Sequence, residues 1–343
     1  MKTIDLSLQV EERRRALGWS QSELATKIGT SRQTLIAIEH GRTRIHLDLA
    51  VALADALGVP LDTLVGRTNR PTTWRWFNSV TPSTTIPTVW GEVEDQLVVV
   101  PYYLTGDTGH IDAWWDSNAQ QLVPTSEARH PHQVILVGGC DPHLSWLKSA
   151  FEQVQTTHTM ELIPTSSTVA VRWLRQGFLH LAGSHWYNST RKAYNVFGSE
   201  SESSLSRLGY LKWQEGIFWH PGRPEPQSWA VREVGSEARA VFERTKSALM
   251  HPVLDATFTR HLDLTRYVLS HETVGGLGLG SLAAPLGLAF RALVEEPYEW
   301  ILHRDALTTH WFSLLLQTLQ QSDLKDRLTR TPHQTPFRWG QVD

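Results

Sequence analysis

The pattern of apolar positions near the start of the chain predicts two short helices joined by a tight turn. Apolar residues recur at helical spacing on both sides of Gly29: Leu24, Ala25 and Ile28 before it, Leu35 and Ile38 after it. Ser20 and Glu23 have the spacing of a capping box, and Gly41 stands where a helix can end in the left-handed conformation. The stretch 20–41 is therefore interpreted as a helix-turn-helix.

Further helical patterns flank this motif. We expect a first helix over 6–17, a fourth over 47–57 that Gly58 ends, and a short fifth over 60–65 with Pro60 in its first turn. Together they predict an all-α domain of five helices over residues 1–66.

From residue 133 onward the pattern alternates between strands and helices. Strands are expected at 134–137, 160–163 and 179–182, with helices at 143–154 and 169–176 between them. This βαβαβ order predicts a parallel sheet with a cleft at the carboxyl ends of its strands. Later segments continue the pattern, with strands at 211–219, 229–234 and 290–302 and a closing helix at 307–320. A chain that crosses to a second lobe and returns in this way predicts a two-lobed α/β domain over 133–343.

The segment between the two domains divides into two parts. Residues 67–88 are rich in Thr, Pro, Ser and Asn and are expected to be a linker whose tryptophans dock on a neighbouring domain. Residues 89–132 alternate and predict a β-rich connecting segment with turns at Glu94-Asp95 and Gly106-Asp107. A later stretch, 188–206, is expected to be a surface excursion.

The second helix of the predicted motif has a polar face opposite Leu35 and Ile38. That face carries Ser31, Arg32, Gln33, Thr34 and Ala37. Such a donor-rich face suits base edges in the major groove of DNA. The three arginines 13–15 are expected near the DNA backbone or on a solvated face. Ser31 and Thr34 have an equally good interpretation as helix caps.

The motif residues resemble the Cro and phage-repressor class of helix-turn-helix domains, the XRE-like family, over about residues 6–66. The resemblance implies that Gln21 contacts a phosphate or braces a recognition residue. It also implies that Arg32, Gln33 and Ala37 read bases and that Arg42 and Arg44 contact phosphates. His40 stands where the family usually has Asn and can still donate. An alternative is that the domain packs against a protein partner instead of DNA.

Three predicted helix starts in the C-terminal domain could face one cleft. They are Asp141-Pro142, the hydroxyl-rich run 165–168, and Gly235-Ser236 before a helix running to about 249. Free backbone N–H groups and the helix dipole favour anions at such places. The alternative for each hydroxyl is that it only caps its helix.

The ordered motifs 137–144, 182–185, 194–195, 235–239 and 276–280 resemble the periplasmic-binding-protein-like domain of type II. Such domains occur behind helix-turn-helix modules and are similar to molybdate-binding proteins and to LysR-type effector domains. The resemblance and the helix starts together imply these ligand-binding candidates: Cys140, Asp141, Thr165, Ser166, Ser167, Thr168, His185, Tyr194, Asn195, Gly235, Ser236 and Arg239. Glu237 departs from the family pattern and would repel an oxyanion.

Composition narrows the range of functions. The net charge of −3 confines any DNA contact to a local patch, such as 27–44, which has four basic residues against Glu39 alone. One cysteine excludes an intrachain disulfide and a cysteine zinc site. No long apolar run predicts a signal peptide or membrane span, so a cytoplasmic protein is expected. We expect no catalytic residues, no metal site and no cofactor apart from a small-molecule effector.

These observations predict a one-component transcription regulator rather than an enzyme. A homodimer or higher oligomer would bind a double-stranded DNA operator through the N-terminal domain. The two-lobed domain would sense a small anionic ligand, such as a molybdate-like oxyanion. One alternative is that the second domain binds no ligand and serves dimerisation or protein recruitment. An enzyme of molybdenum-cofactor metabolism is disfavoured because no catalytic constellation is found.

Overall fold

The computed structural model describes residues 10–11, 13–15, 17–40, 43, 45–58, 74–106, 109–154, 157–197, 204–224, 226, 228–248 and 253–343. The chain divides into two compact units, Met1–Thr72 and Thr73–Asp343. None of the helices among the described residues is long and apolar enough to cross a membrane.

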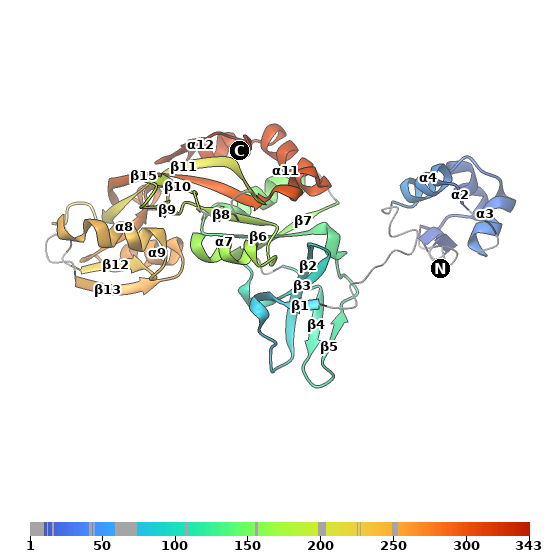
Figure 1. Ribbon diagram of the computed structural model, residues 1–343, viewed down its shortest axis with the longest axis horizontal. Coiled ribbons are helices and arrows are strands. Elements are labelled where there is room, and N and C mark those ends of the chain that lie inside the picture. Colours follow the sequence, from blue (N-terminus) through green and yellow to red (C-terminus); the bar gives the residue numbers. More distant parts are fainter. Residues whose placement is uncertain are drawn as a thin grey trace. The chain divides into compact units, whose positions relative to one another are not determined.

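The N-terminal unit contains the predicted helix-turn-helix (Figure 1). Helix α2 spans Gln21–Lys27, α3 Arg32–Glu39 and α4 Leu47–Leu57, which Gly58 ends in the left-handed conformation. The capping box is present, since Glu23 N donates to Ser20 Oγ and Ser20 N donates to Glu23 Oε2. The apolar stripes meet in one core: Val10, Leu24, Ala25, Ile28, Leu35, Ile38, Leu53, Ala54 and Leu57. The predicted fifth helix lies outside the described residues.

The C-terminal unit opens with a small sheet in the order β1-β3-β2-β4-β5. Its strands are β1 (Trp74–Trp76), β2 (Ile86–Val93), β3 (Gln96–Pro101), β4 (Ala113–Asp116) and β5 (Gln121–Pro124). Glu94 and Asp95 both have positive φ and form the predicted turn between β2 and β3. Strand β1 lies within 67–88, so that segment is not a linker over its whole length.

The main sheet runs in the order β13-β12-β14-β11-β15-β8-β6-β7, and β16 (Gln334–Pro336) pairs with β11. One lobe has the parallel strands β6 (Val134–Gly139), β7 (Thr159–Pro164) and β8 (Leu181–Ser184). The second lobe has the parallel strands β12 (Ser228–Arg232), β13 (Val253–Phe258) and β14 (Val274–Leu279). The predicted βαβαβ order and the two-lobed α/β class are confirmed.

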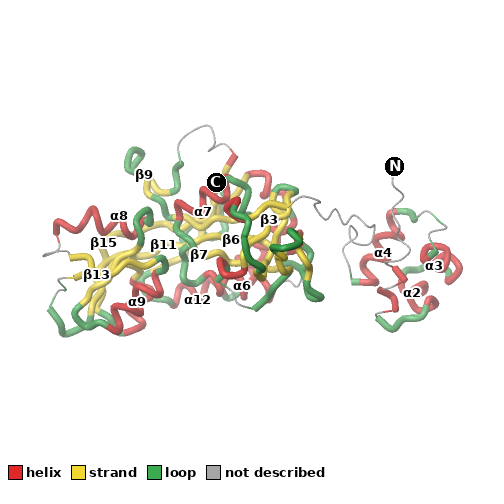
Figure 2. Tube along the Cα trace, turned by 90° about the horizontal axis from the view of Figure 1, so that it is seen from below, coloured by secondary structure: helices red, strands yellow, loops and turns green. Residues whose placement is uncertain are grey.

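Two long antiparallel strands join the lobes. They are β11 (Leu205–Trp219) and β15 (Ala289–His303), which pair with each other along their whole length. Strand β11 also pairs with β14 of the second lobe, and β15 pairs with β8 of the first. Figure 2 shows these strands running side by side with β6 and β7 through the unit. The lobes therefore share one continuous hydrogen-bonded sheet.

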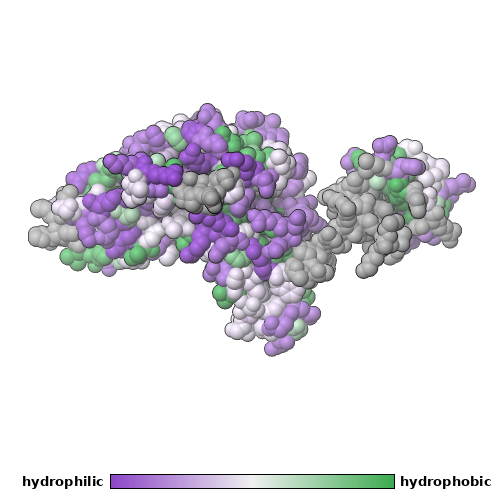
Figure 3. Space-filling view, viewed as in Figure 1, coloured by the Kyte–Doolittle hydropathy of each residue, from purple (hydrophilic) through white to green (hydrophobic). Residues whose placement is uncertain are grey.

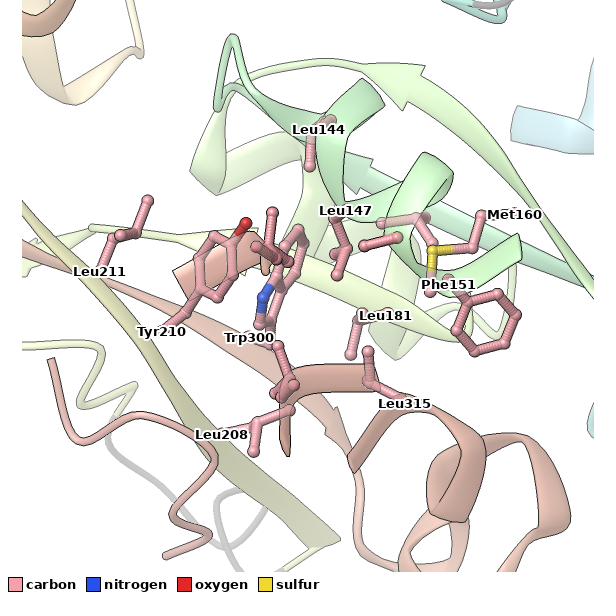
Figure 4. Close-up of a cluster of buried hydrophobic side chains, with 14 of the residues drawn as sticks. Leu144, Leu147, Phe151, Met160, Leu181, Leu208, Tyr210, Leu211, Trp300 and Leu315 are labelled. Atoms are coloured by element: carbon pink, nitrogen blue, oxygen red, sulfur yellow. The ribbon is translucent and has the colours of Figure 1, made fainter. Parts of the chain in front are cut away.

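Helices cover both lobes. In the first lobe they are α6 (Leu144–Val154), α7 (Ser167–Arg175), α11 (His310–Gln321) and α12 (Leu324–Arg330). In the second they are α8 (Glu237–Thr245), α9 (His261–Ser270) and the short α10 (Gly280–Ala283). Figure 4 shows the core in which Leu144 and Leu147 of α6 pack with Trp300 of β15 and Leu315 of α11.

The surface excursion predicted for 188–206 is wrong in part. Strands β9 (Tyr187–Asn188) and β10 (Ala193–Tyr194) form a hairpin, and β11 already begins at Leu205. Asn195 is buried, and its side-chain amide donates to Ser184 O and Glu299 Oε2. On the face visible in Figure 3, hydrophilic and hydrophobic residues are interspersed over the C-terminal unit, as on a solvent-exposed surface.

His180 ties the small sheet to the first lobe. Its Nδ1 accepts from Leu136 N at 3.0 Å, and its Nε2 donates to the carbonyl oxygen of Glu92 at 2.8 Å. Burial lowers the pKa of His180 to about 4. Because Nε2 carries the one proton of the neutral ring and Nδ1 accepts a hydrogen bond, the folded state has no room for a second proton on Nδ1.

This arrangement predicts acid sensitivity of the C-terminal unit. The unfolded chain protonates His180 near pH 6.5 whereas the folded chain does not, so stability is lost as the pH falls from about 6.5 towards 4, by about 3 kcal/mol in total. Urea unfolding at several pH values measures the slope. His180→Gln should be less stable at pH 7 but lose less on acidification. An equally steep slope in this variant would contradict the assignment.

Candidate functional site

The structure places the predicted DNA-reading residues on one face of α3. Ser31, Arg32 and Gln33 are exposed, and Thr34 and Ala37 are half-buried, while Leu35 and Ile38 lie in the core. Ser31 Oγ accepts from Thr34 N at 3.0 Å and lies 2.8 Å from Thr34 Oγ1. These two hydroxyls therefore bond to each other, and Ser31 caps the helix, which leaves Arg32 and Gln33 as the long side chains of this face.

A buried ion pair supports this face from behind. Arg14 donates from Nε to Glu39 Oε1 at 2.6 Å and from Nη1 to Trp19 O at 2.8 Å, and both charged side chains are buried. Gln21 Nε2 donates to Glu39 Oε2 at 2.9 Å. Burial alone would raise the pKa of Glu39. The hydrogen bonds from Arg14 and Gln21 nevertheless hold this pKa below its usual value.

These contacts correct the expectation for one of the three arginines 13–15. Arg14 is not near a DNA backbone or on a solvated face, because it is 7% exposed and paired with Glu39, whereas Arg13 and Arg15 are exposed. Gln21 braces Glu39 at the end of α3. The exposed His40 donates from Nδ1 to the carbonyl oxygen of Ile36 at 2.7 Å. Arg42 and Arg44 lie outside the described residues.

In the C-terminal unit the starts of α7 and α8 meet across the two lobes. Thr168 Oγ1 donates to the carbonyl oxygen of Gly235 at 3.3 Å. Ser167 Oγ accepts from His185 N at 3.1 Å, and Ser236 Oγ accepts from Arg239 N at 3.2 Å. These hydroxyls of the predicted ligand set already have partners within the protein.

Among the other predicted ligand residues, Cys140 lies beside Ser167 and His185. Its Sγ is 3.3 Å from His185 Nε2 and 4.0 Å from Ser167 Oγ. Asp141 Oδ1 accepts from His143 N at 2.9 Å in the turn before α6, and Thr165 N donates to Gly139 O. Ser166 is the N-cap of α7 but its side chain makes no cap bond, and Arg239 Nε donates to Glu243 Oε1 at 2.8 Å. The Arg239 guanidinium is thus paired at the surface.

The site contains buried carboxylates that the sequence analysis did not select. Glu296 Oε2 lies 2.7 Å from His185 Nδ1, and Tyr194 OH donates to Glu296 Oε1 at 3.3 Å. Glu215 is fully buried, and the ligand atoms of His185, Glu215 and Glu296 all lie within 4.8 Å of one another. Glu237, at the start of α8, accepts from Tyr187 N at 3.3 Å and from Arg244 Nη2 at 3.0 Å.

Burial dominates the protonation of these groups. Burial, and next the charge of Glu237, raises the pKa of Glu296 to about 8. Burial and the neighbouring Glu296 raise the pKa of Glu215 well above its usual range. Burial opposes the charged form of His185, but Cys140 and the nearby carboxylates outweigh it, and the pKa of His185 is raised.

A signal for the missed residues was present in the strand patterns. Alternation along β11 puts Glu215 on the same face as the buried Trp213, and a charged residue on a buried face marks a functional site. Strand β15 has three glutamates, of which Glu296 and Glu299 are buried.

Gly183 and Gly139 leave room for the hydroxyl group of Tyr298, because a Cβ atom at either position would lie within 2.3 Å of that oxygen.

A hollow of about 310 Å³ lies at the other end of β11. Its lining residues are Arg191, Asn195, Val196, Phe197, Leu205, Arg207, Ile301, Arg304 and Asp343. Three of these are arginines, and Asn195 is the member of the predicted ligand set found here.

Comparisons with known proteins agree with this architecture. A helix-turn-helix family model matches residues 10–64, and the model of the PBP superfamily domain matches residues 148–320, about half of the chain. An uncharacterized HTH-type transcriptional regulator of Methanothermobacter thermautotrophicus is 49% identical over 49 residues, which are 14% of this chain and 71% of that protein. The chain is an HTH-type transcriptional regulator with a PBP superfamily domain.

Solved structures similar to the regulator's C-terminal unit include an ABC-type phosphate transport receptor from Vibrio cholerae. It is 12% identical with a TM-score of 0.42, over 59% of the regulator and 100% of that chain. The regulatory domain of MetR, a LysR family regulator from N. meningitidis, is 10% identical with a TM-score of 0.42, over 59% and 97% of the two chains.

The Arg14–Glu39 pair gives a test of how the regulator's DNA-binding domain is held together. Arg14→Met leaves Glu39 buried without its cation, and we expect a loss of about 3 kcal/mol in the N-terminal unit. The double variant Arg14→Met/Glu39→Met should recover most of it. Hydrogen exchange of amides in 20–40 of the full chain measures both. Equal losses in the two variants would show that the ion pair does not set stability.

Proposed function

We propose that the protein is a cytoplasmic one-component regulator in which a small ligand bound between the two lobes modulates operator binding. The observation that carries the proposal is the pairing of β11 with β15, which joins two parallel-stranded lobes whose helices α7 and α8 start at a shared contact. Closure of such lobes around a ligand would alter the geometry of a homodimer and thus the spacing of its DNA half-sites. The protein binds its effector without turnover.

The charge of the ligand depends on which part of the C-terminal unit holds it. The helix start at Ser167 favours the molybdate-like oxyanion that the sequence predicts, whereas Glu237 at the start of α8 opposes it. The buried carboxylates of Glu215 and Glu296 oppose an anion beside His185. The hollow lined by Arg191, Arg207 and Arg304 is a better electrostatic match for an oxyanion.

A second candidate function is a regulator whose PBP-like domain binds no ligand and serves dimerisation or protein recruitment. The contacts between Thr168 and Gly235 and between Tyr187 and Glu237 favour it, because they join the lobes through the protein's own groups. The two functions differ in whether any small molecule stabilises the C-terminal unit.

For the DNA interface we predict different effects from two arginine variants. Arg32→Ala should weaken binding to the operator by about 1–3 kcal/mol while binding to random DNA changes little, because Arg32 contacts base edges. Arg44→Ala should weaken binding to both sequences alike and reduce the salt dependence, because it contacts phosphate. Fluorescence anisotropy with both duplexes at two salt concentrations measures this. Equal losses on both duplexes for Arg32→Ala would contradict base reading.

For the ligand we predict stabilisation of the full chain in a thermal-shift screen. Molybdate, tungstate, sulfate, phosphate, small carboxylates and divalent cations would be compared at a concentration of about 100 times the dissociation constant, where about 2.7 kcal/mol of stabilisation is expected. If an oxyanion is active, Arg207→Ala should reduce its effect. No stabilisation by any compound would favour the domain as a dimerisation or recruitment module.

A further inference from the structure

The side chains of His185, Glu215 and Glu296 form a compact group in the interior of the C-terminal unit. Glu215 comes from β11 and Glu296 from β15, where Glu296 pairs with Trp213, so both carboxylates lie on the same face of the two paired strands. His185 directly follows β8 and reaches them from the first lobe. Their ligand atoms all lie within 4.8 Å of one another.

Glu215 has no hydrogen-bond donor with good geometry among the described residues, and the charged groups that act on it are Glu296, His185 and Arg232. It is 0% exposed, and neither of its carboxylate oxygens has a hydrogen-bond partner. Arg232, which is also buried, donates to Glu233 and to the carbonyl oxygen of Thr259. Arg244 is half-exposed and bonds to Glu237. A buried carboxylate without a donor is costly, so its free oxygens point to a ligand that supplies positive charge.

We propose that His185, Glu215 and Glu296 bind one divalent first-row transition-metal cation. An imidazole nitrogen and two carboxylates are ligands that Zn²⁺ and Mn²⁺ accept. His185 binds through Nδ1, which already faces Glu296, while Nε2–H donates to Cys140 Sγ at 3.3 Å and fixes the ring. The ion takes the place of the proton between Nδ1 and Glu296 Oε2 and of the proton on the buried Glu215 carboxyl, and both protons leave to solvent.

The position of this group connects the cation to both lobes. Glu215 and Glu296 belong to the strands that cross between the lobes, and His185 belongs to the first. Tyr194 also bonds to Glu296, and its ring lies 5.0 Å from the ring of Tyr187 in a tilted arrangement. The backbone N–H of Tyr187 donates to Glu237 of the second lobe. The inference rests on the proposed function, since it names the class of ligand that the lobes hold.

The first experiment measures binding of the metal alone to the chelator-treated full chain. Titration calorimetry with ZnCl₂ and MnCl₂ should give one site per chain, and Glu215→Gln and His185→Gln should each weaken it at least tenfold. His132→Ala is the matched control, because His132 stacks on His130 and contacts Glu92 at 3.2 Å, where zinc could bind at the surface. Loss of binding in His132→Ala, or unchanged binding in Glu215→Gln, would overturn the assignment.

The second experiment separates lost binding from lost folding. Without metal, Glu215→Gln should melt at or above the wild-type temperature, because a buried unpaired carboxylate is removed, yet zinc should no longer raise its melting temperature. A Co²⁺ spectrum of the wild type should indicate oxygen and nitrogen ligands and be unchanged in Cys140→Ser. Wild-type protein that binds no cation would mean that Glu215 is simply a protonated buried acid, and the inference would fail.

Operator binding distinguishes failure of this inference from failure of the proposed function. If the chain binds no cation but another small molecule changes operator affinity, the inference fails while the proposed function holds. If zinc binds with the expected variant pattern and shifts operator affinity in the wild type but not in Glu215→Gln, both are supported. If zinc binds but operator affinity stays constant, the metal site is supported and its role as effector is overturned.

Discussion

The antiparallel pairing of β11 with β15 is the constraint on which the rest of the C-terminal unit depends. Each strand is long enough to serve both lobes, and their mutual hydrogen bonds join the parallel strands β8, β6 and β7 to β14, β12 and β13. Parallel strands need crossover connections, whereas an antiparallel pair can run straight from one lobe into the other. The pairing therefore fixes how the starts of α7 and α8 face each other. It also brings Glu215 beside Glu296.

Burial of these two carboxylates conflicts with the rule that charge stays at the surface unless it is paired. The surrounding aromatic side chains make the conflict sharper, since Trp213 and Tyr298 are fully buried and lie against the His185 ring. An apolar wall of this kind lowers the local dielectric and strengthens any interaction with a charged group. Conflicts between local and global rules mark functional sites more often than defects in the fold.

Elements that local spacing specifies were predictable from the sequence, whereas contacts between distant segments were not. The capping box at Ser20 and the alternation of strands and helices after residue 133 depend on neighbours along the chain, and the structure has both. The partner of Arg14 could not be predicted, because Glu39 reaches it only through packing of α3 against the preceding helical residues. In the same way, alternation indicates that Glu215 is buried, but only strand pairing shows that Glu296 is its neighbour.

The same reasoning explains why helix starts alone were an incomplete guide to the ligand. Glu237 occupies the first position of α8, where the helix dipole favours its negative charge, and Tyr187 N and Arg244 complete its bonds. The positive end of this helix is thus satisfied by a carboxylate of the protein itself. Thr168 and Ser167 are likewise engaged with Gly235 and His185. Because these donors have partners while the oxygens of Glu215 have none, the unpartnered polar groups in the interior are carboxyl oxygens, which become ligands for a cation when their proton leaves.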